Sequence, residues 1–358
     1  MKNNTELSNL QKQQLQNKIQ SGLLGGSIGD ALGAPVEMRT GGNIKKNFGK
    51  IVEYISILNN GGFKEKGFPT DLGGFVTDDT LLTFAIVKSY NELGKLDLND
   101  IFKKHQEAYD SFPYGFGGAT KYGMKNIQEG IPLEQSGLKD SAGNGVVMKQ
   151  FPFAAVAATQ DIPEEEMIDM IVTHARATHD SDIAVVSSIT HHKFLKTLLE
   201  TQPGKLNKKE LLNNLITFIK PYEEKFPKDE NKMTNILSGL RDAIDEETNK
   251  LNLSDEEILD KFGRGNIETD DPRDVFKSAY VIFTLGIVYA IFLRDENFDV
   301  ILNSINIGGD TDSYAAIAGN MVGAYNGIEY EDKYINGLQK KDEILSDTQA
   351  FIAKLFSE

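Results

Sequence analysis

The chain has 358 residues, with 38 Lys and Arg against 53 Asp and Glu, which gives a formal net charge of −15. This acidic balance disfavours binding to nucleic-acid phosphates, which requires a basic face, and docking on anionic lipid. The chain has no Cys, which excludes disulfides, Fe–S clusters, thiolate metal sites and a Cys nucleophile. A catalytic metal would therefore need oxygen or imidazole ligands, and only five His are present.

Neither the start of the chain nor its longest apolar run indicates export or a membrane. Residues 1–20 are rich in Asn, Gln and Lys and lack the apolar segment of a secretory signal. The apolar run 278–293 is shorter than the roughly 20 residues that a membrane-spanning helix needs. We therefore expect a cytoplasmic protein without membrane contact, in which a polar N-terminal extension (residues 1–19) precedes one domain (residues 20–358).

Helical periodicity dominates the rest of the chain, so the sequence predicts an all-α fold. The predicted helices cover residues 16–33, 78–93, 97–110, 163–178, 182–200, 208–220, 231–246, 254–262, 272–294, 297–305, 311–326 and 342–357. Residues 51–58 are the only segment in which we expect a strand. Long Gly-rich stretches separate some of the helices, and irregular loops of this kind are often functional; they are residues 40–43, 59–74, 113–118 and 137–145.

Two of the predicted helices carry small residues along one face. These residues are Gly22, Gly25 or Gly26, Gly29 and Gly33 in the first helix, and Ala315, Gly319, Gly323 and Gly327 in the other. Gly in a helix costs about 1 kcal/mol relative to Ala, and a chain tolerates this cost where backbones approach closely. We therefore expect the two helices to pack tightly, with their acidic ends near each other.

Two acidic clusters stand where helices are predicted to begin. They are Thr77-Asp78-Asp79-Thr80 and Gly308-Gly309-Asp310-Thr311-Asp312-Ser313. Each cluster alone is consistent with helix capping, because acids stabilise the first turn of a helix. If the clusters converge, four carboxylates would repel one another unless cations bind, and Mg²⁺, Mn²⁺ or Ca²⁺ prefer such oxygen ligands. A pair of ions about 3.5–4 Å apart would suit this set.

Three further features could contribute to a site. Glu37 stands on a loop beyond Gly33 and Pro35, where it is either solvated or serves as a general base or substrate clamp. The Gly-rich segments 114–118 and 141–145 expose backbone N–H groups that can bind phosphate oxygens. His179, between two predicted helices, is either a capping residue or a ligand contact.

These motifs occur in the order typical of the ADP-ribosylglycohydrolase family, which the chain resembles over about residues 20–330. The resemblance rests on the segments 29–37, 77–80, 143–145, 175–179 and 308–319. It implies a compact orthogonal bundle of helices with two Mg²⁺ ions in a cleft, for which Mn²⁺ could substitute. The implied reaction is hydrolysis of the bond between C1 of ADP-ribose and an acceptor side chain, which reverses ADP-ribosylation.

The resemblance also implies roles for individual residues. The metal ligands would be Thr77, Asp78, Asp79, Asp310, Asp312 and Ser313, and the catalytic residues would be Glu37, Asp78 and Asp310. The substrate would contact Gly115, Phe116, Gly117, Ser141, Gly143, Asn144, Gly145 and His179. Ser313 stands where family members usually have Thr, and the hydroxyl ligand is kept. Three other departures from the family pattern leave the acceptor open: Lys149 for Arg, the bulky Phe116, and the segment 180–182.

ADP-ribosyl-arginine in a protein is the expected substrate, with serine-, nucleobase- or O-acetyl-linked ADP-ribose as alternatives. An isoprenoid synthase or phosphohydrolase is disfavoured: a synthase would carry its acids in mid-helix, facing a deep aromatic pocket. A third alternative is a binding protein that neutralises a toxin through residues 1–20, although the complete set of carboxylates argues for catalysis. The physiological target and the oligomeric state do not follow from the sequence.

Overall fold

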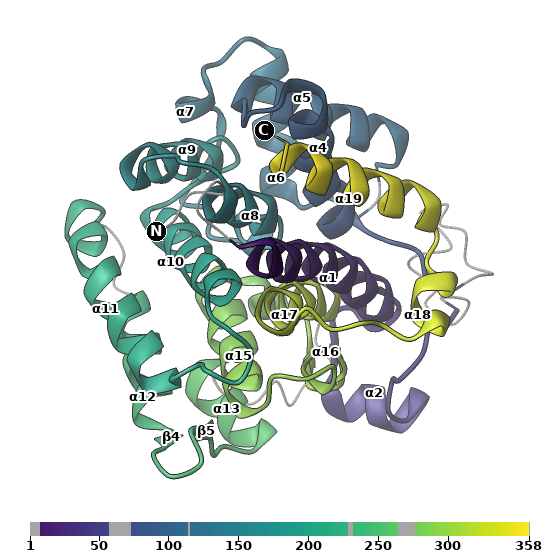
Figure 1. The fold of residues 1–358 in the computed structure, drawn as a ribbon, viewed down its shortest axis with the longest axis vertical. Coiled ribbons are helices and arrows are strands. Elements are labelled where there is room, and N and C mark those ends of the chain that lie inside the picture. Colours follow the sequence, from purple (N-terminus) through teal and green to yellow (C-terminus); the bar gives the residue numbers. More distant parts are fainter. Residues whose placement is uncertain (1–7, 57–72, 114, 228–231, 264–275, 358) are drawn as a thin grey trace.

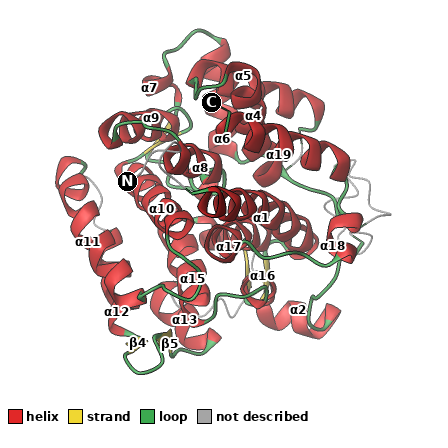
Figure 2. Ribbon diagram, viewed as in Figure 1, coloured by secondary structure: helices red, strands yellow, loops and turns green. Residues whose placement is uncertain are grey.

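The computed structural model describes residues 8–56, 73–113, 115–227, 232–263 and 276–357. Within these ranges nearly all of the regular secondary structure is helical, which confirms the predicted all-α class (Figure 2). Helices α1 (Asn9–Gly33) and α17 (Thr311–Asn326) lie side by side through the middle of the molecule, and the other helices surround them (Figure 1). No described helix is long and apolar enough to cross a membrane.

The helices around this central pair follow in chain order. The first group comprises α2 (Gly41–Phe48), α4 (Asp78–Leu93), α5 (Leu98–Ser111), α6 (Gly118–Gln128), α7 (Leu133–Ser136), α8 (Phe151–Thr159), α9 (Glu164–Arg176) and α10 (Asp182–Glu200). The second group comprises α11 (Lys208–Lys225), α12 (Met233–Asp242), α13 (Asp255–Phe262), α15 (Val281–Arg294), α16 (Asp299–Asn306), α18 (Asp332–Gly337) and α19 (Lys341–Leu355). Short 3₁₀ turns cover Ala34–Val36, Asn144–Val146 and Phe276–Ala279.

All twelve predicted helices exist, with ends shifted by a few residues in most cases. Five others were not predicted: α2, α6, α7, α8 and α18. Helix α8 is the clearest case, because eight of its nine residues are buried. A helix that is apolar all round lacks the periodic pattern on which the prediction depends.

The strands of the described residues are pairs of two residues each. Strand β1 (Arg39–Thr40) pairs antiparallel with β6 (Gly308–Gly309), and β2 (Leu138–Lys139) pairs parallel with β3 (His179–Asp180). Strand β4 (Ile244–Asp245) pairs antiparallel with β5 (Lys250–Leu251).

The predicted strand is wrong for residues 51–56, which form none, and residues 57–58 lie outside the described residues. The backbone of Ile51 exchanges its hydrogen bonds with the side-chain amide of Asn306 instead of with a neighbouring strand.

Helix α1 begins earlier than expected, so the predicted boundary at residue 20 falls inside it. Ser8 caps the helix in a reciprocal pair of hydrogen bonds with Gln11. Leu15 and Ile19 are buried, and Lys18 Nζ donates to backbone carbonyls at the end of α10. Residues 9–20 are therefore part of the helical body, while residues 1–7 lie outside the described residues.

The small residues of α1 and α17 face each other, which confirms the predicted tight packing. A Cβ atom added at Gly29 would lie 2.0 Å from the carbonyl oxygen of Ala315, and one added at Gly33 would lie 2.3 Å from that of Thr311. At the far end of the pair, a Cβ atom at Gly323 would lie 2.2 Å from the backbone nitrogen of Gly22. The helices are therefore antiparallel, and the last turn of α1 lies beside the first turn of α17.

Candidate active site

A cavity of about 430 Å³ opens where three acidic segments meet. Glu37 comes from the loop after α1, Asp78 and Asp79 from the first turn of α4, and Asp310 and Asp312 from the start of α17. The cavity is also lined by a Gly-rich wall, which consists of the segment 115–120 without Phe116 and the segment 141–145. The volume lies within the range of about 300–1,000 Å³ that is usual for small-molecule sites.

The first turn of α4 is held in place by Asp30, which lies in the last turns of α1. The buried carboxylate of Asp30 accepts hydrogen bonds from the backbone N–H and the hydroxyl of both Thr77 and Thr80, at 2.5–3.2 Å. Thr77 is the N-cap residue of α4, but its hydroxyl donates to Asp30 instead of accepting from the helix. Sequence reasoning did not assign this role to Asp30; the available signal was an acid among small residues on a helix predicted to be buried.

The starts of α4 and α17 are linked by a direct hydrogen bond. Ser313 Oγ donates to Asp79 Oδ2 at 3.2 Å. The other oxygen of that carboxylate, Asp79 Oδ1, is buried and accepts no hydrogen bond from any described residue. A buried carboxylate oxygen without a partner is costly, and a bound cation would remove that cost.

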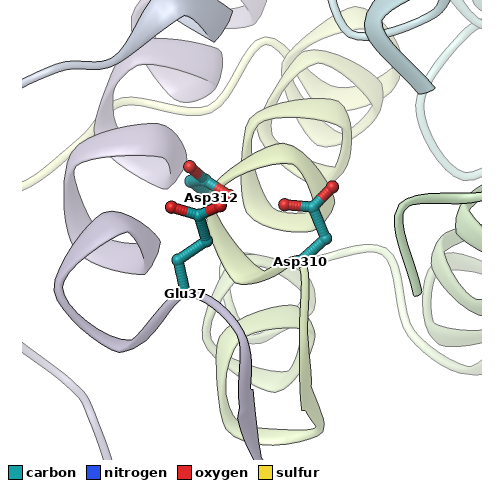
Figure 3. A group of neighbouring side chains, drawn as sticks. All are labelled: Glu37, Asp310 and Asp312. Carbon is teal, nitrogen blue, oxygen red and sulfur yellow. The ribbon is translucent and has the colours of Figure 1, made fainter. Parts of the chain in front are cut away.

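Glu37 reaches Asp310 and Asp312 because two short strands pair. Figure 3 shows these three side chains on the loop after α1 and at the start of α17, and their carboxylate oxygens lie within 4.8 Å of one another. Met38 N donates to the carbonyl of Gly309 at 2.8 Å, which continues the β1–β6 pairing toward Glu37. Gly308 allows this approach: its φ is +84°, and a Cβ atom there would lie 2.3 Å from the backbone nitrogen of Gly41.

Asn144 orients Asp310. Its side-chain amide donates to Asp310 Oδ2 at 2.6 Å and to Thr284 Oγ1 at 3.1 Å. Asn144 also lines the cavity, as expected for a substrate contact, so one residue connects the Gly-rich wall to the acidic wall.

Burial and mutual repulsion raise the pKa values of the clustered acids. Burial, reinforced by the nearby charge of Asp30, raises the pKa of Asp78 to about 7. Burial also raises the pKa of Asp30 to about 6, although four hydrogen bonds lower it in part. The pKa values of Asp79, Asp310 and Asp312 are raised for the same main reason. Full ionisation of the unbound cluster is therefore unfavourable, and its hard oxygen donors fit Mg²⁺ or Mn²⁺.

The Gly-rich wall approaches both the acids and His179. Gly115 has a φ of +86°, and a Cβ atom there would lie 3.0 Å from Asp78 Oδ1. Cβ atoms at Gly143 and Gly145 would each lie 3.1 Å from the ring of His179. Burial lowers the pKa of His179 to about 3, so its imidazole is neutral at physiological pH.

Most of the predicted site residues line the cavity, and two do not. The predicted residues that line it are Glu37, Asp78, Asp79, Gly115, Gly117, Ser141, Gly143, Asn144, Gly145, His179, Asp310, Asp312 and Ser313. Thr77 is instead hydrogen-bonded to Asp30. Phe116 is buried against Tyr109, with ring centroids 5.1 Å apart, because its aromatic ring packs into the core.

Sequence reasoning missed the cavity residues just before α15. Lys277, Ala279 and Tyr280 line the cavity because Val281 N donates to the carbonyl of Ala142 at 2.9 Å. Ala279 and Tyr280 belong to a long apolar run that was interpreted as buried helix, so no local signal marked them.

Comparison with known proteins identifies the family. The family model for ADP-ribosylglycohydrolases matches residues 11–358. The chain belongs to the ADP-ribosylglycohydrolase family. This membership confirms the resemblance predicted from the motifs, and it makes the chain a hydrolase of ADP-ribose linkages.

Individual relatives are distant but match over most of their length. The chain is 24% identical over 307 residues to the ADP-ribosyl-[dinitrogen reductase] glycohydrolase of Rhodospirillum rubrum, covering 86% of this chain and 84% of that protein. It is 23% identical over 329 residues to the ADP-ribosylarginine hydrolase Tri1 of Pseudomonas putida, covering 89% and 73%. A solved structure described as an ADP-ribosylglycohydrolase-related protein complex shares the fold, with a TM-score of 0.66, 21% identity and coverage of 96% and 99%.

Proposed function

We propose that this chain removes ADP-ribose from arginine side chains of proteins in a Mg²⁺-dependent hydrolysis. The observation that carries the proposal is the convergence of five carboxylates from three separate segments at one cavity. Capping accounts for an acid at the start of each helix, but it does not account for Glu37 joining Asp310 and Asp312 within 4.8 Å.

The acidic wall divides into two sets of oxygen ligands. One Mg²⁺ would be held by Glu37, Asp310 and Asp312. A second would be held by Asp78, Asp79 and Ser313, next to Thr77, whose hydroxyl donates to Asp30. When bound, the ions would supply positive charge that fixes the ribose hydroxyls and offsets the repulsion among the carboxylates.

The Gly-rich wall of the cavity suits the diphosphate of ADP-ribose. Gly115, Gly117, Gly143 and Gly145 line the cavity, so their backbone is accessible without side-chain cover. Backbone N–H groups in such loops bind phosphate oxygens. Among the described lining residues Lys277 is the only Lys or Arg, so recognition of the diphosphate would depend mainly on main-chain donors and cations.

The chain's own residues can perform the bond cleavage. Glu37 would accept a proton from a water molecule as the water oxygen bonds to C1, while the bond from C1 to the guanidinium nitrogen breaks and its electron pair stays on that nitrogen. The neutral guanidine so released would take up the proton from Glu37, which gives free ADP-ribose and an arginine side chain. The surrounding carboxylates favour the positive charge that develops on the ribose. They also favour a cationic acceptor such as a guanidinium group over a neutral one, which is the structural argument for arginine.

A substrate panel tests the proposal. Arginine-, serine- and DNA-linked ADP-ribose are each incubated with the protein in Mg²⁺ and in chelator, and free ADP-ribose is measured. We expect release from the arginine conjugate, a loss of all activity in chelator, and a reduction of more than about 100-fold in Asp310→Ala. The loss should exceed about 100-fold because residues that only support a metal ligand already contribute about 10–100-fold, and Asp310 is itself a proposed ligand. Asp342→Ala, which removes an exposed first-turn acid of α19, is the matched control and should retain activity.

Release of ADP-ribose from only the serine or the DNA conjugate would show that the acceptor is not arginine. The reaction would still be hydrolysis of an ADP-ribose linkage. Full activity of Asp310→Ala in chelator would contradict the metal-dependent mechanism.

A further inference from the structure

A closed ring of hydrogen bonds leads from Asp310 back to the first turn of α17. Asn144, which donates to Asp310 Oδ2, also donates to Thr284 Oγ1. Thr284 Oγ1 in turn donates to the carbonyl of Ser278 at 3.0 Å, and the hydroxyl of Tyr314 donates to the same carbonyl at 3.0 Å. The ring closes within α17, where Tyr314 N donates to the carbonyl of Asp310 at 2.9 Å.

Thr284 uses its hydroxyl differently from other buried helical residues of its kind. It is completely buried and is the only Ser or Thr of α15. On α10, the hydroxyls of Ser188 and Thr190 donate to the carbonyl four residues back in their own helix, as is common for such side chains. Thr284 instead donates to Ser278, which lies outside α15, and accepts from Asn144. Its hydroxyl therefore connects separate segments.

The direction of these hydrogen bonds follows from the chemistry of the groups. A carbonyl oxygen can only accept, so the single hydroxyl proton of Thr284 points to Ser278. The Thr284 oxygen can then only accept, and it requires the NH₂ side of the Asn144 amide. That NH₂ group is the one that donates to Asp310. Rotation of the amide by half a turn would place its oxygen against Thr284 Oγ1, which has no further proton to donate.

Burial makes this requirement strict. The side chains of Asn144, Thr284 and Tyr314 are all buried, so water cannot replace a partner that is lost, and an unpaired buried donor is costly. The ring also joins the Gly-rich wall to the 3₁₀ turn Phe276–Ala279, which lines the cavity, and to α17.

We propose that Thr284 is a positioning residue that fixes the orientation of the Asn144 amide and, through it, the carboxylate of Asp310. Thr284 does not itself line the cavity, so its effect on the site passes through Asn144. Only the effect on cation binding rests on the proposed function, because the hydrogen bonds that fix Asn144 do not involve a cation.

A double-mutant cycle in chelator tests the positioning role. Thermal unfolding is measured for the wild type, Thr284→Val, Asp310→Ala and the double variant. Val preserves the branched shape of Thr and removes the hydroxyl. We expect the double variant to lose less Tm than the sum of the two single variants, because either change alone already frees the Asn144 amide. Losses that simply add would overturn the positioning role.

Mg²⁺ titration followed by thermal shift tests the effect on cation binding. We expect Thr284→Val to need about tenfold more Mg²⁺ for half of the full rise in Tm, because residues that support a metal ligand contribute about 10–100-fold. Thr284→Ser keeps the hydroxyl and should retain most of the wild-type affinity. Thr190→Val is the matched control, because it removes an equally buried hydroxyl that bonds only within its own helix, and its affinity should match the wild type.

The outcomes of the titration separate this proposal from the proposed function. Equal affinities in Thr284→Val and the wild type would overturn the effect on cation binding, and so would an equal loss in Thr284→Ser and Thr284→Val. No Mg²⁺ effect on the wild type would instead contradict the proposed metal site, while the cycle in chelator would still decide the positioning role. If Thr284→Val does not fold, both measurements are made on Thr284→Ala, which removes the hydroxyl without placing a methyl group against the Asn144 amide.

Discussion

Replacing Gly29 with Ala tests the close contact between α1 and α17 that brings the acid clusters together. The added Cβ atom would lie 2.0 Å from the carbonyl oxygen of Ala315, whereas ordinary contact begins at 3.4 Å. The two backbones would have to separate by about 1.4 Å. Neither side of the contact is a flexible side chain that could rotate away, so the helices themselves must move.

The expected cost follows from this overlap. Overpacking of this kind costs about 3 kcal/mol, and the higher helix propensity of Ala returns about 1 kcal/mol. An unfolding entropy of about 2.1 cal/mol/K per residue gives about 0.75 kcal/mol/K for 358 residues. The net loss of about 2 kcal/mol therefore lowers Tm by about 3 °C.

Gly42→Ala provides the matched control, because a Cβ atom there would meet no atom within 4 Å. The same propensity gain then acts alone and should raise Tm by about 1 °C. Differential scanning calorimetry of both variants, with and without Mg²⁺, measures the difference. We also expect a smaller Mg²⁺-induced rise in Tm for Gly29→Ala, because the shift moves Glu37 away from Asp310. Equal Tm values for the two variants would refute the reasoning.

Two further predictions concern Asp30 and the pH dependence of Mg²⁺ binding. Asp30→Ala removes the acceptor of four buried donors and should cost about 3 kcal/mol or more in urea denaturation. Asp97→Ala, which removes one N-cap bond of α5, should cost about 1 kcal/mol, and equal losses would contradict the assigned role. Burial raises the pKa of Asp78 to about 7 in the folded, metal-free protein, so the folded state binds more protons than the unfolded state above about pH 4. This contribution to stability decreases from about pH 4 to about pH 7, and Mg²⁺ must displace the same protons. The Tm difference between Mg²⁺ and chelator should therefore be small near pH 5 and large near pH 8, and a difference independent of pH would contradict this.

Features that depend on neighbours along the chain were predictable. Helices α4, α10 and α17 have the predicted bounds, because an amphipathic pattern with acids or hydroxyls at its start is a local signal. The small residues repeated along one face of each helix also predicted the α1–α17 pair. Repeated Gly on one face destabilises a helix unless a second backbone packs closely against that face.

Features that depend on which segments meet in space were not predictable in the same way. Asp30 appeared as one residue of a helical motif, and only the approach of α4 makes it the acceptor for Thr77 and Thr80. Phe116 looked like part of an open loop, and only the packing of Tyr109 places its ring in the core.

The sequence by itself determined the helical class, the family and the identities of the acidic residues. Hydrophobic periodicity, helix capping and short motifs depend only on residues that are close together in the chain. The tertiary structure decided that Glu37 joins Asp310 and Asp312 and that Asn144 orients Asp310. These are contacts between residues more than 70 positions apart in the sequence, as for Asn144 and Asp310, which are separated by 166 positions. The energy of burying a charge depends on every group around it, and packing alone brings those groups together.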